Sequence, residues 1–130
     1  MNEPVFKEDK FAKSAGIEII EITKKLSLVR AKITAEHLNS LGTVQGGMLY
    51  TVADFAFAVL ANYLHPETVT QCGNITYIRP AITSEVTAIA KEIECVGRTC
   101  IVEVTVKDDK GDTVCVCHFN GFIKEMKKES

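Results

Sequence analysis

The sequence is organised around Gly46-Gly47-Met48-Leu49-Tyr50-Thr51-Val52-Ala53-Asp54-Phe55-Ala56-Phe57-Ala58-Val59-Leu60-Ala61. Two glycines open this run, no proline interrupts it before Pro66, and apolar residues fall on nearly every side of the helix that it would form. A helix that is apolar all round belongs in a protein core or in a membrane. A membrane span needs about 20 apolar residues without a charge, whereas this run is shorter and carries Asp54 at its middle. The run is therefore predicted to be a buried central helix.

Asp54 is an unusual residue for such a helix. Burying an isolated carboxylate costs several kcal/mol unless the group is paired, hydrogen-bonded or protonated. The helix itself offers only the hydroxyls of Tyr50 and Thr51 as nearby donors. Asp54 is therefore either a structural acid satisfied by another element or a catalytic carboxylate in a dry cleft, and the helix alone favours neither reading.

The Gly46-Gly47 pair lies where the helix would begin. The first amides of a helix have no acceptors within the helix, and they can hold an oxyanion at the positive end of the helix dipole. Glycine allows a ligand to approach this backbone closely. By itself the pair is a weak signal, because glycine is common in loops.

Two stretches of the chain resemble hotdog-fold acyl-CoA thioesterases. The first is Asn39-Ser40-Leu41-Gly42-Thr43-Val44-Gln45-Gly46-Gly47, followed by Ala53-Asp54, and the second is Asn74-Ile75-Thr76-Tyr77-Ile78-Arg79-Pro80-Ala81. The most similar group is the phenylacetate-degradation and thioesterase-superfamily type. That group carries Asn-x-x-Gly-x-x-His-Gly-Gly, with an Asp seven residues after the second glycine. The resemblance spans about residues 16–124 and differs at one position, where Gln45 replaces the usual His.

The resemblance implies a catalytic set. Asn39 and the backbone amide of Gly46 would bind the thioester oxygen, and Asp54 would act as nucleophile or general base. A looser alignment implies that Thr70 helps to position the water. Without the resemblance, Asn39 is an ordinary turn-forming residue and Thr70 an ordinary β-branched strand residue.

The resemblance also implies a substrate-binding set of Gln45, Gly47 and Arg79. Gln45 can donate and accept hydrogen bonds, but unlike His it cannot titrate near neutrality. Arg79 is a candidate for the phosphates of coenzyme A, as is Arg98, although each taken singly is more typical of a solvated charge. His37, His65 and His118 form no recognisable nucleophilic triad with a cysteine and an acid.

Alternating apolar residues predict six strands, at 17–22, 26–33, 68–78, 85–96, 100–108 and 113–123. A loop is predicted over 34–44. A short amphipathic helix is predicted over 6–13, with Phe6 and Phe11 packed against the body and Gly16 ending it. These elements predict an α+β protein, an antiparallel sheet wrapped around a long central helix. The hotdog topology itself is implied by the resemblance.

Composition and charge limit the kinds of protein that this chain can be. The 130 residues are expected to form one domain, 1–130, with a net charge of −2 and no basic stripe, which argues against nucleic-acid binding. The polar start of the chain predicts neither a signal peptide nor a membrane segment, so we expect a cytoplasmic protein.

The five cysteines are expected to be reduced thiols. Cys95 and Cys100 would face each other across a hairpin, whereas Cys115 and Cys117 would share one face of a strand. Because no second ligand pair completes a metal site beside Cys115 and Cys117, neither a metal nor a cofactor is predicted.

The leading hypothesis is a homo-oligomeric acyl-CoA thioesterase, a homodimer that stacks into a homotetramer. Gly46 and Asp54 lie eight residues apart, about 12 Å along one helix, which favours a site shared between two chains. A non-catalytic acyl-CoA binding module is the alternative, and the substitution at Gln45 keeps it open. A hotdog dehydratase would need a His across from the acid, and none stands at the expected place. The sequence does not identify the acyl group.

Overall fold

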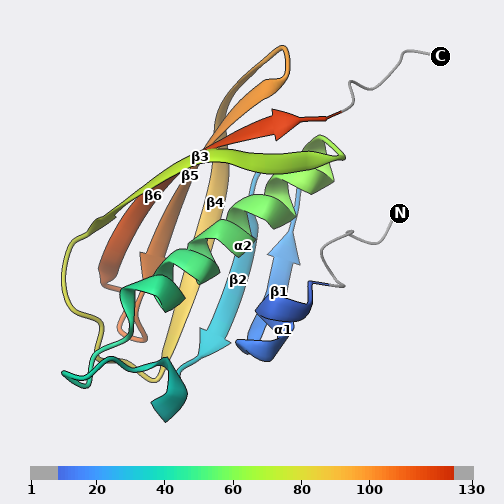
Figure 1. The fold of residues 1–130 in the computed structure, drawn as a ribbon. Coiled ribbons are helices and arrows are strands. Elements are labelled where there is room, and N and C mark those ends of the chain that lie inside the picture. Colours follow the sequence, from blue (N-terminus) through green and yellow to red (C-terminus); the bar gives the residue numbers. More distant parts are fainter. Residues whose placement is uncertain (1–8, 125–130) are drawn as a thin grey trace.

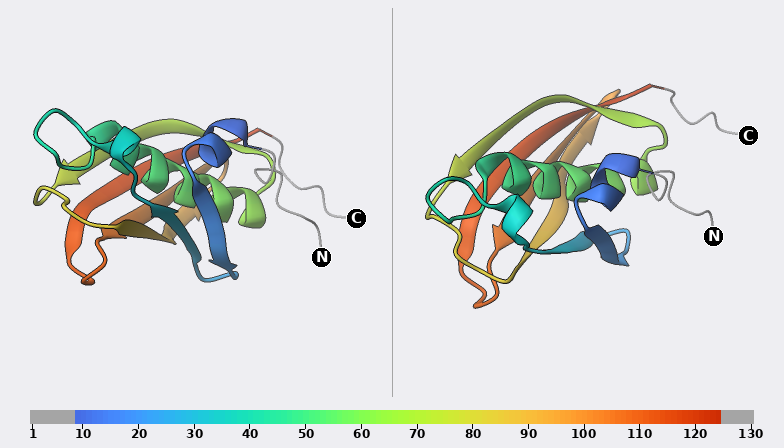
Figure 2. Two further views of the ribbon diagram at one scale, coloured as in Figure 1. Left: turned by 90° about the horizontal axis from the view of Figure 1, so that it is seen from below. Right: turned by 60° about the horizontal axis from the view of Figure 1, so that its bottom comes forward.

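Within residues 9–124, which the computed structural model describes, six strands form one antiparallel sheet (Figure 1). Their order across the sheet is β1-β2-β4-β5-β6-β3. Their bounds are β1 Ile17–Ile22, β2 Ser27–Lys32, β3 Thr68–Tyr77, β4 Glu85–Val96, β5 Thr99–Lys107 and β6 Thr113–Ile123. The sheet curls around one long helix, α2 (Gly46–Leu64) (Figure 2). The predicted hotdog architecture is therefore confirmed.

Helix α2 is the centre of the core. Ten of its residues are buried, and it packs mainly against β4, β5 and β2. Small residues such as Ala53 and Ala56, both fully buried, let the helix lie close to the sheet. The buried hydroxyl of Ser27 on β2 donates to the Ala56 carbonyl oxygen at 2.7 Å. By length and composition alone α2 would also pass as a membrane span, but the curled sheet covers much of its surface.

The alternation predicted for β5 is confirmed. Its even-numbered positions Cys100, Val102, Val104 and Val106 are fully buried. On the neighbouring β4 the register shifts between Glu92 and Glu94, so β4 contains a bulge near its end. Cys95 pairs directly with Cys100 across the hairpin, as expected, and all five thiols are free.

Among the strands of residues 9–124, β3 forms one edge of the sheet and pairs only with β6. Its positions 69–74 are all exposed, as are Thr76 and Tyr77. A ten-residue strand with one free edge presents unpaired backbone groups to any second chain that approaches it.

The N-terminal helix differs from its prediction. Helix α1 covers Lys10–Ser14, and the Asp9 side chain caps it by accepting from the Ala12 N–H at 3.0 Å. The start of the predicted 6–13 helix, including Phe6, lies outside the described residues. The expected packing of Phe11 is wrong, because its side chain is 69% exposed and Ala12 makes the buried contact instead. Gly16 ends the segment with a φ of +80°, a conformation that favours glycine.

The segment that leads into α2 is built from a short 3₁₀ helix, η2 (Ala35–His37), and a bridge between Leu38 and Val44. It lies beside the connection between β3 and β4 (Figure 2), where the Val44 N–H donates to the Ala81 carbonyl oxygen at 2.9 Å. The start of α2 is thus held by chain segments far apart in the sequence.

Candidate active site

Asp54 and Thr70 meet between the central helix and the edge strand. Thr70 Oγ1 on β3 donates to Asp54 Oδ1 on α2 at 2.9 Å. The hydrogen-bond donor that Asp54 needs therefore comes from the sheet, although α2 itself carries Tyr50 and Thr51 close by. Asp54 is half-buried and Thr70 is exposed, so the pair lies at the surface of a single chain.

The surroundings of Asp54 make its carboxylate more basic. Burial raises the pKa of Asp54, the hydrogen bond from Thr70 opposes this rise, and the charge of Asp9 adds to it. One helical turn earlier, burial and the charge of Asp54 raise the pKa of Tyr50. A carboxylate with a raised pKa is a stronger base when it is ionised, which suits it to accept a proton from water.

Backbone amides are exposed at the first turn of α2. Gln45 is the N-cap residue, and its Oε1 accepts from the Gly47 N–H at a long 3.5 Å. The Gln45 carbonyl oxygen accepts from the Met48 N–H at 2.9 Å. None of the hydrogen bonds within residues 9–124 uses the Gly46 N–H, which therefore remains available at the positive end of the helix.

Tyr77 holds this turn in place and was missed by the sequence reasoning. Its hydroxyl donates to the Gly46 carbonyl oxygen at 2.9 Å. A Cβ added at Gly46 would lie only 3.0 Å from the Tyr77 hydroxyl oxygen, so a larger residue here would press on the Tyr77 side chain. Tyr77 stands in the stretch quoted for the family resemblance, but that stretch indicated only a strand.

Asn39 builds the loop before α2. Its Oδ1 accepts from the backbone N–H groups of Leu41 and Thr43, at 2.9 and 3.1 Å. Its Nδ2 donates to Thr43 Oγ1 at 2.8 Å. The structure therefore shows Asn39 as a turn-forming residue, and one of its two amide protons is already used in a hydrogen bond. A role toward a thioester oxygen would use the second.

A cavity of about 370 Å³ opens beside the start of α2. Its lining comprises Thr43, Val44, Gly46, Leu49, Tyr77, Ile78, Arg79, Pro80 and Ala81. Arg79 Nη1 lies 3.9 Å from Asp112 Oδ2, and its side chain is about half exposed. By contrast, Arg98 donates to the Lys124 carbonyl oxygen at 2.8 Å and lies over the Phe122 ring, so Arg98 has a structural role at the far hairpin.

Asp54 does not line this cavity. It lies eight residues beyond Gly46 on the same helix, about 12 Å along the axis. One chain thus carries an amide site at the start of α2 and a carboxylate–hydroxyl pair at its middle, at separate places.

The three histidines have partners elsewhere. His37 Nδ1 accepts from the Thr34 N–H at 3.1 Å, His65 pairs with Glu92, and His118 pairs with Glu103. His118 is exposed and lies next to the buried Cys117 on β6, so it points to the face of the sheet away from α2. Within the described chain, no imidazole is paired with Asp54, as a dehydratase would require.

Comparison with known proteins gives a consistent set of relatives. A family model described as a domain of unknown function, DUF4442, matches residues 6–123. The acyl-coenzyme A thioesterase PaaI of Escherichia coli (strain K12) is 26% identical over 113 residues, which cover 86% of this chain and 81% of that protein. The solved structure of the E. coli PaaI protein superimposes with a TM-score of 0.87 over 92% of this chain and 88% of that one.

A second protein of similar structure comes from another bacterium. A hypothetical thioesterase protein from Streptococcus pneumoniae TIGR4, solved with coenzyme A, has a TM-score of 0.86 and 24% identity. The match covers 95% of this chain and 100% of that one. At this identity the likeness shows the shared fold.

Proposed function

The chain belongs to the DUF4442 family and has the hotdog fold of the PaaI-type thioesterases, and we propose a mechanism by which it hydrolyses acyl-CoA to a free acid and coenzyme A. It is an acyl-CoA thioesterase. The observation that carries the proposed mechanism is the hydrogen bond between Thr70 and Asp54. It places a carboxylate of raised pKa next to a hydroxyl that can orient water.

In the proposed reaction the thioester carbonyl oxygen accepts a hydrogen bond from the Gly46 N–H. That donor stabilises the negative charge which develops on the oxygen as the carbonyl carbon is attacked. Asp54 takes a proton from a water molecule held against Thr70, and the water oxygen attacks the carbonyl carbon. The C–S bond then breaks, and the departing coenzyme A thiolate recovers the proton from Asp54.

Direct attack by Asp54 on the carbonyl is the second route to the same products. It would form an acyl–Asp54 anhydride that water then hydrolyses. Label found in Asp54 after one turnover in ¹⁸O-labelled water would establish the anhydride route. General-base catalysis puts the label only into the released acid, whereas hydrolysis of the anhydride at the Asp54 carboxyl would put the label into Asp54.

We place each site between two chains. A nucleophile and an oxyanion donor must both lie about 3 Å from the reacting carbon, and a single α2 separates Asp54 from Gly46 too far. Two antiparallel copies of α2 related by a two-fold axis bring Asp54 of one chain beside Gly46 of the other. The exposed edge of β3 supports this arrangement, because Thr70 lies on that edge strand and pairing two such edges would bury it.

A non-catalytic acyl-CoA binding module is the second candidate. Two features favour it: Gln45 cannot titrate near neutrality, and one of the two Asn39 amide protons is already donated to Thr43. Such a module would keep the cavity at the start of α2 and bind acyl-CoA without turnover.

A hydrolysis screen tests the proposal directly. Acetyl-, medium-chain, long-chain and aromatic acyl-CoA are supplied in turn, and release of the free thiol is followed. We expect turnover of at least one class, with Asp54→Asn losing most of it while still binding acyl-CoA. Glu21→Gln, which removes a charge at an exposed position of β1, is the matched control and should keep full activity. Tight binding without hydrolysis by the wild type would favour the binding module.

A further inference from the structure

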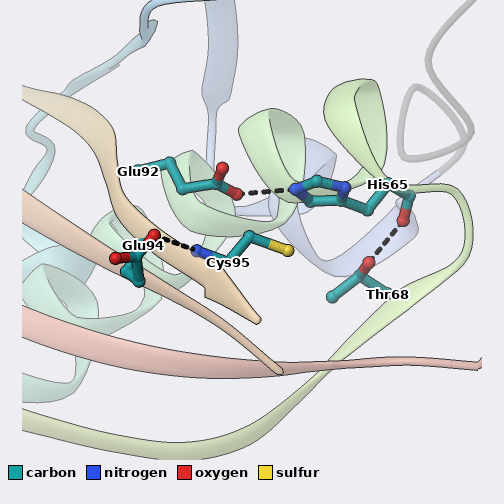
Figure 3. Close-up of polar contacts among 5 residues, drawn as sticks. All are labelled: His65, Thr68, Glu92, Glu94 and Cys95. Carbon is teal, nitrogen blue, oxygen red and sulfur yellow. Dashed lines mark hydrogen bonds and ion pairs between the residues drawn. The ribbon is translucent and has the colours of Figure 1, made fainter. Parts of the chain in front are cut away.

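A second group of polar side chains gathers at the C-terminal end of α2, away from Gly46. His65, the C-cap residue, places Nε2 2.7 Å from Glu92 Oε2 on β4. Cys95, near the end of the same strand, directs its sulfur toward the imidazole (Figure 3). One nitrogen, one oxygen and one sulfur from these three residues lie within 4.8 Å of one another.

The bulge in β4 creates this cluster. In a regular strand, residues three apart point to opposite faces of the sheet, so the spacing of Glu92 and Cys95 predicts that they do not meet. The register shift adds one unpaired residue between them, and as a result Glu92 pairs with Val102 while Cys95 pairs with Cys100. Both partners are fully buried on the face toward α2, so Glu92 and Cys95 also point to that face. Bulges commonly re-aim a side chain in this way.

The backbone that carries the imidazole is held from both sides. The His65 N–H donates to the Ala61 carbonyl oxygen at 2.7 Å, and the Thr68 hydroxyl donates to the His65 carbonyl oxygen (Figure 3). Asn62 closes the same turn, because its Oδ1 accepts from the Thr68 N–H at 2.9 Å and its Nδ2 donates to the Thr68 carbonyl oxygen at 3.0 Å. Such a fixed position lowers the entropic cost of binding a ligand.

The electrostatics of the cluster favour a cation. Within residues 9–124, no Lys or Arg forms an ion pair with Glu92, whose partner is His65. A divalent ion would offset the repulsion between the Glu92 carboxylate and a Cys95 thiolate, and would displace the thiol proton on binding.

We propose that His65, Glu92 and Cys95 form a binding site for a divalent transition-metal ion of the zinc type. Imidazole nitrogen, carboxylate oxygen and thiolate sulfur are all zinc ligands, bound at about 2.0–2.3 Å and therefore roughly 3.5 Å from one another. All three side chains are half-buried, so an ion can reach them. Three protein ligands leave the fourth tetrahedral position to water. The ion would tie the end of α2 to the β4–β5 hairpin.

Neither sequence pattern nor family resemblance indicated this site. In the sequence, only Cys115 and Cys117 are spaced to share one face of a strand as a ligand pair would, and they lie on β6. His65 and Glu92 are 27 residues apart in the chain, and the Glu92–Cys95 spacing matches no common zinc motif. The site is independent of the proposed hydrolysis, since none of its three residues belongs to the proposed catalytic set.

Cobalt and zinc titrations of the metal-free full chain test the proposal. We expect one ion per chain, a thiolate-to-cobalt charge-transfer band in the near ultraviolet, and a higher Tm with zinc. Cys95→Ser should abolish the band and weaken zinc binding at least tenfold, and it should remove the rise in Tm. Cys72→Ser, which changes an exposed thiol on β3, should leave all three unchanged.

His65→Gln and Glu92→Gln should each weaken zinc binding at least tenfold in protein whose circular dichroism is unchanged. The absence of zinc and cobalt binding by the wild type would overturn the proposal. A charge-transfer band that persists in Cys95→Ser would also overturn it, because the ion would then be bound by another thiol.

Discussion

Thr70 Oγ1 donates a 2.9 Å hydrogen bond to Asp54 Oδ1 and so joins the edge strand β3 to the middle of the central helix. Burial raises the pKa of Asp54, and this bond opposes the rise. The same contact therefore positions the carboxylate and limits the rise of its pKa.

Thr70→Val removes this hydroxyl at nearly constant volume. Because the Thr70 hydrogen bond opposes the effect of burial, its loss should raise the pKa of Asp54 further. Because activity depends on ionised Asp54, the acid limb of the kcat/KM profile should move to higher pH. In addition, kcat should drop about tenfold or more. Thr70→Ser should restore both. An unchanged pH profile in Thr70→Val would show that the hydrogen bond has no part in the reaction.

Asp54→Asn should stabilise the fold at neutral pH. The folded-state pKa of Asp54 is raised, so the stability linked to its protonation is fully present below the unfolded pKa and is lost as pH rises through the folded pKa. Asn keeps an acceptor for Thr70 without this cost. We expect the Tm of Asp54→Asn to exceed that of the wild type by a few degrees at pH 7, with the difference shrinking as the pH is lowered. A lower Tm for the variant at pH 7 would contradict this account.

Gln45→His should preserve or raise activity. The side chain of Gln45 makes only a long hydrogen bond, 3.5 Å from the Gly47 amide. The thioesterase family that this loop resembles usually carries His at the same position. Measured kcat/KM values for both proteins provide the comparison. A tenfold loss, about 1.4 kcal/mol of transition-state stabilisation, would instead assign Gln45 a specific role.

Tyr77→Phe should loosen the first turn of α2, because it deletes the hydrogen bond to the Gly46 carbonyl oxygen. A neutral hydrogen bond contributes about 1 kcal/mol, so a positioning role predicts a loss of roughly fivefold in kcat. Tyr77 also lines the cavity, but its ring remains in the variant, so KM should change little. A rise in KM at constant kcat would make Tyr77 a binding residue instead.

Much of the fold follows from local sequence patterns. The alternation of Cys100, Val102, Val104 and Val106 indicates both the strand and its buried face. The largely apolar run from Gly46 indicates a buried helix, since a polar stripe is absent. Phe11 misleads because one large apolar residue on a five-residue helix need not be covered, and the small Ala12 makes the contact.

The site is less predictable, because its contacts join elements far apart in the chain. Thr70 reaches Asp54 across 16 residues and Tyr77 reaches Gly46 across 31, and neither contact leaves a periodic pattern. Strand spacing even predicts the wrong relationship for Glu92 and Cys95, since the bulge in β4 changes which face they share. The apolar helix singled out Asp54 and family resemblance implied its role and that of Thr70, but neither gave a reason to single out Tyr77.

The shared site is tested most directly by mixing two inactive variants. Asn39→Ala damages the loop at the start of α2, whether through the amide itself or through the Thr43 contacts that it holds, and Asp54→Ala removes the carboxylate. Each protein alone should be nearly inactive.

Co-refolding equal amounts of the two proteins should produce mixed dimers. In each mixed dimer one site carries both lesions and the other carries neither. With random pairing, half the dimers are mixed, so the account predicts recovery of about a quarter of wild-type activity. If each site lies within a single chain, mixing will recover no activity, and that result would contradict the account.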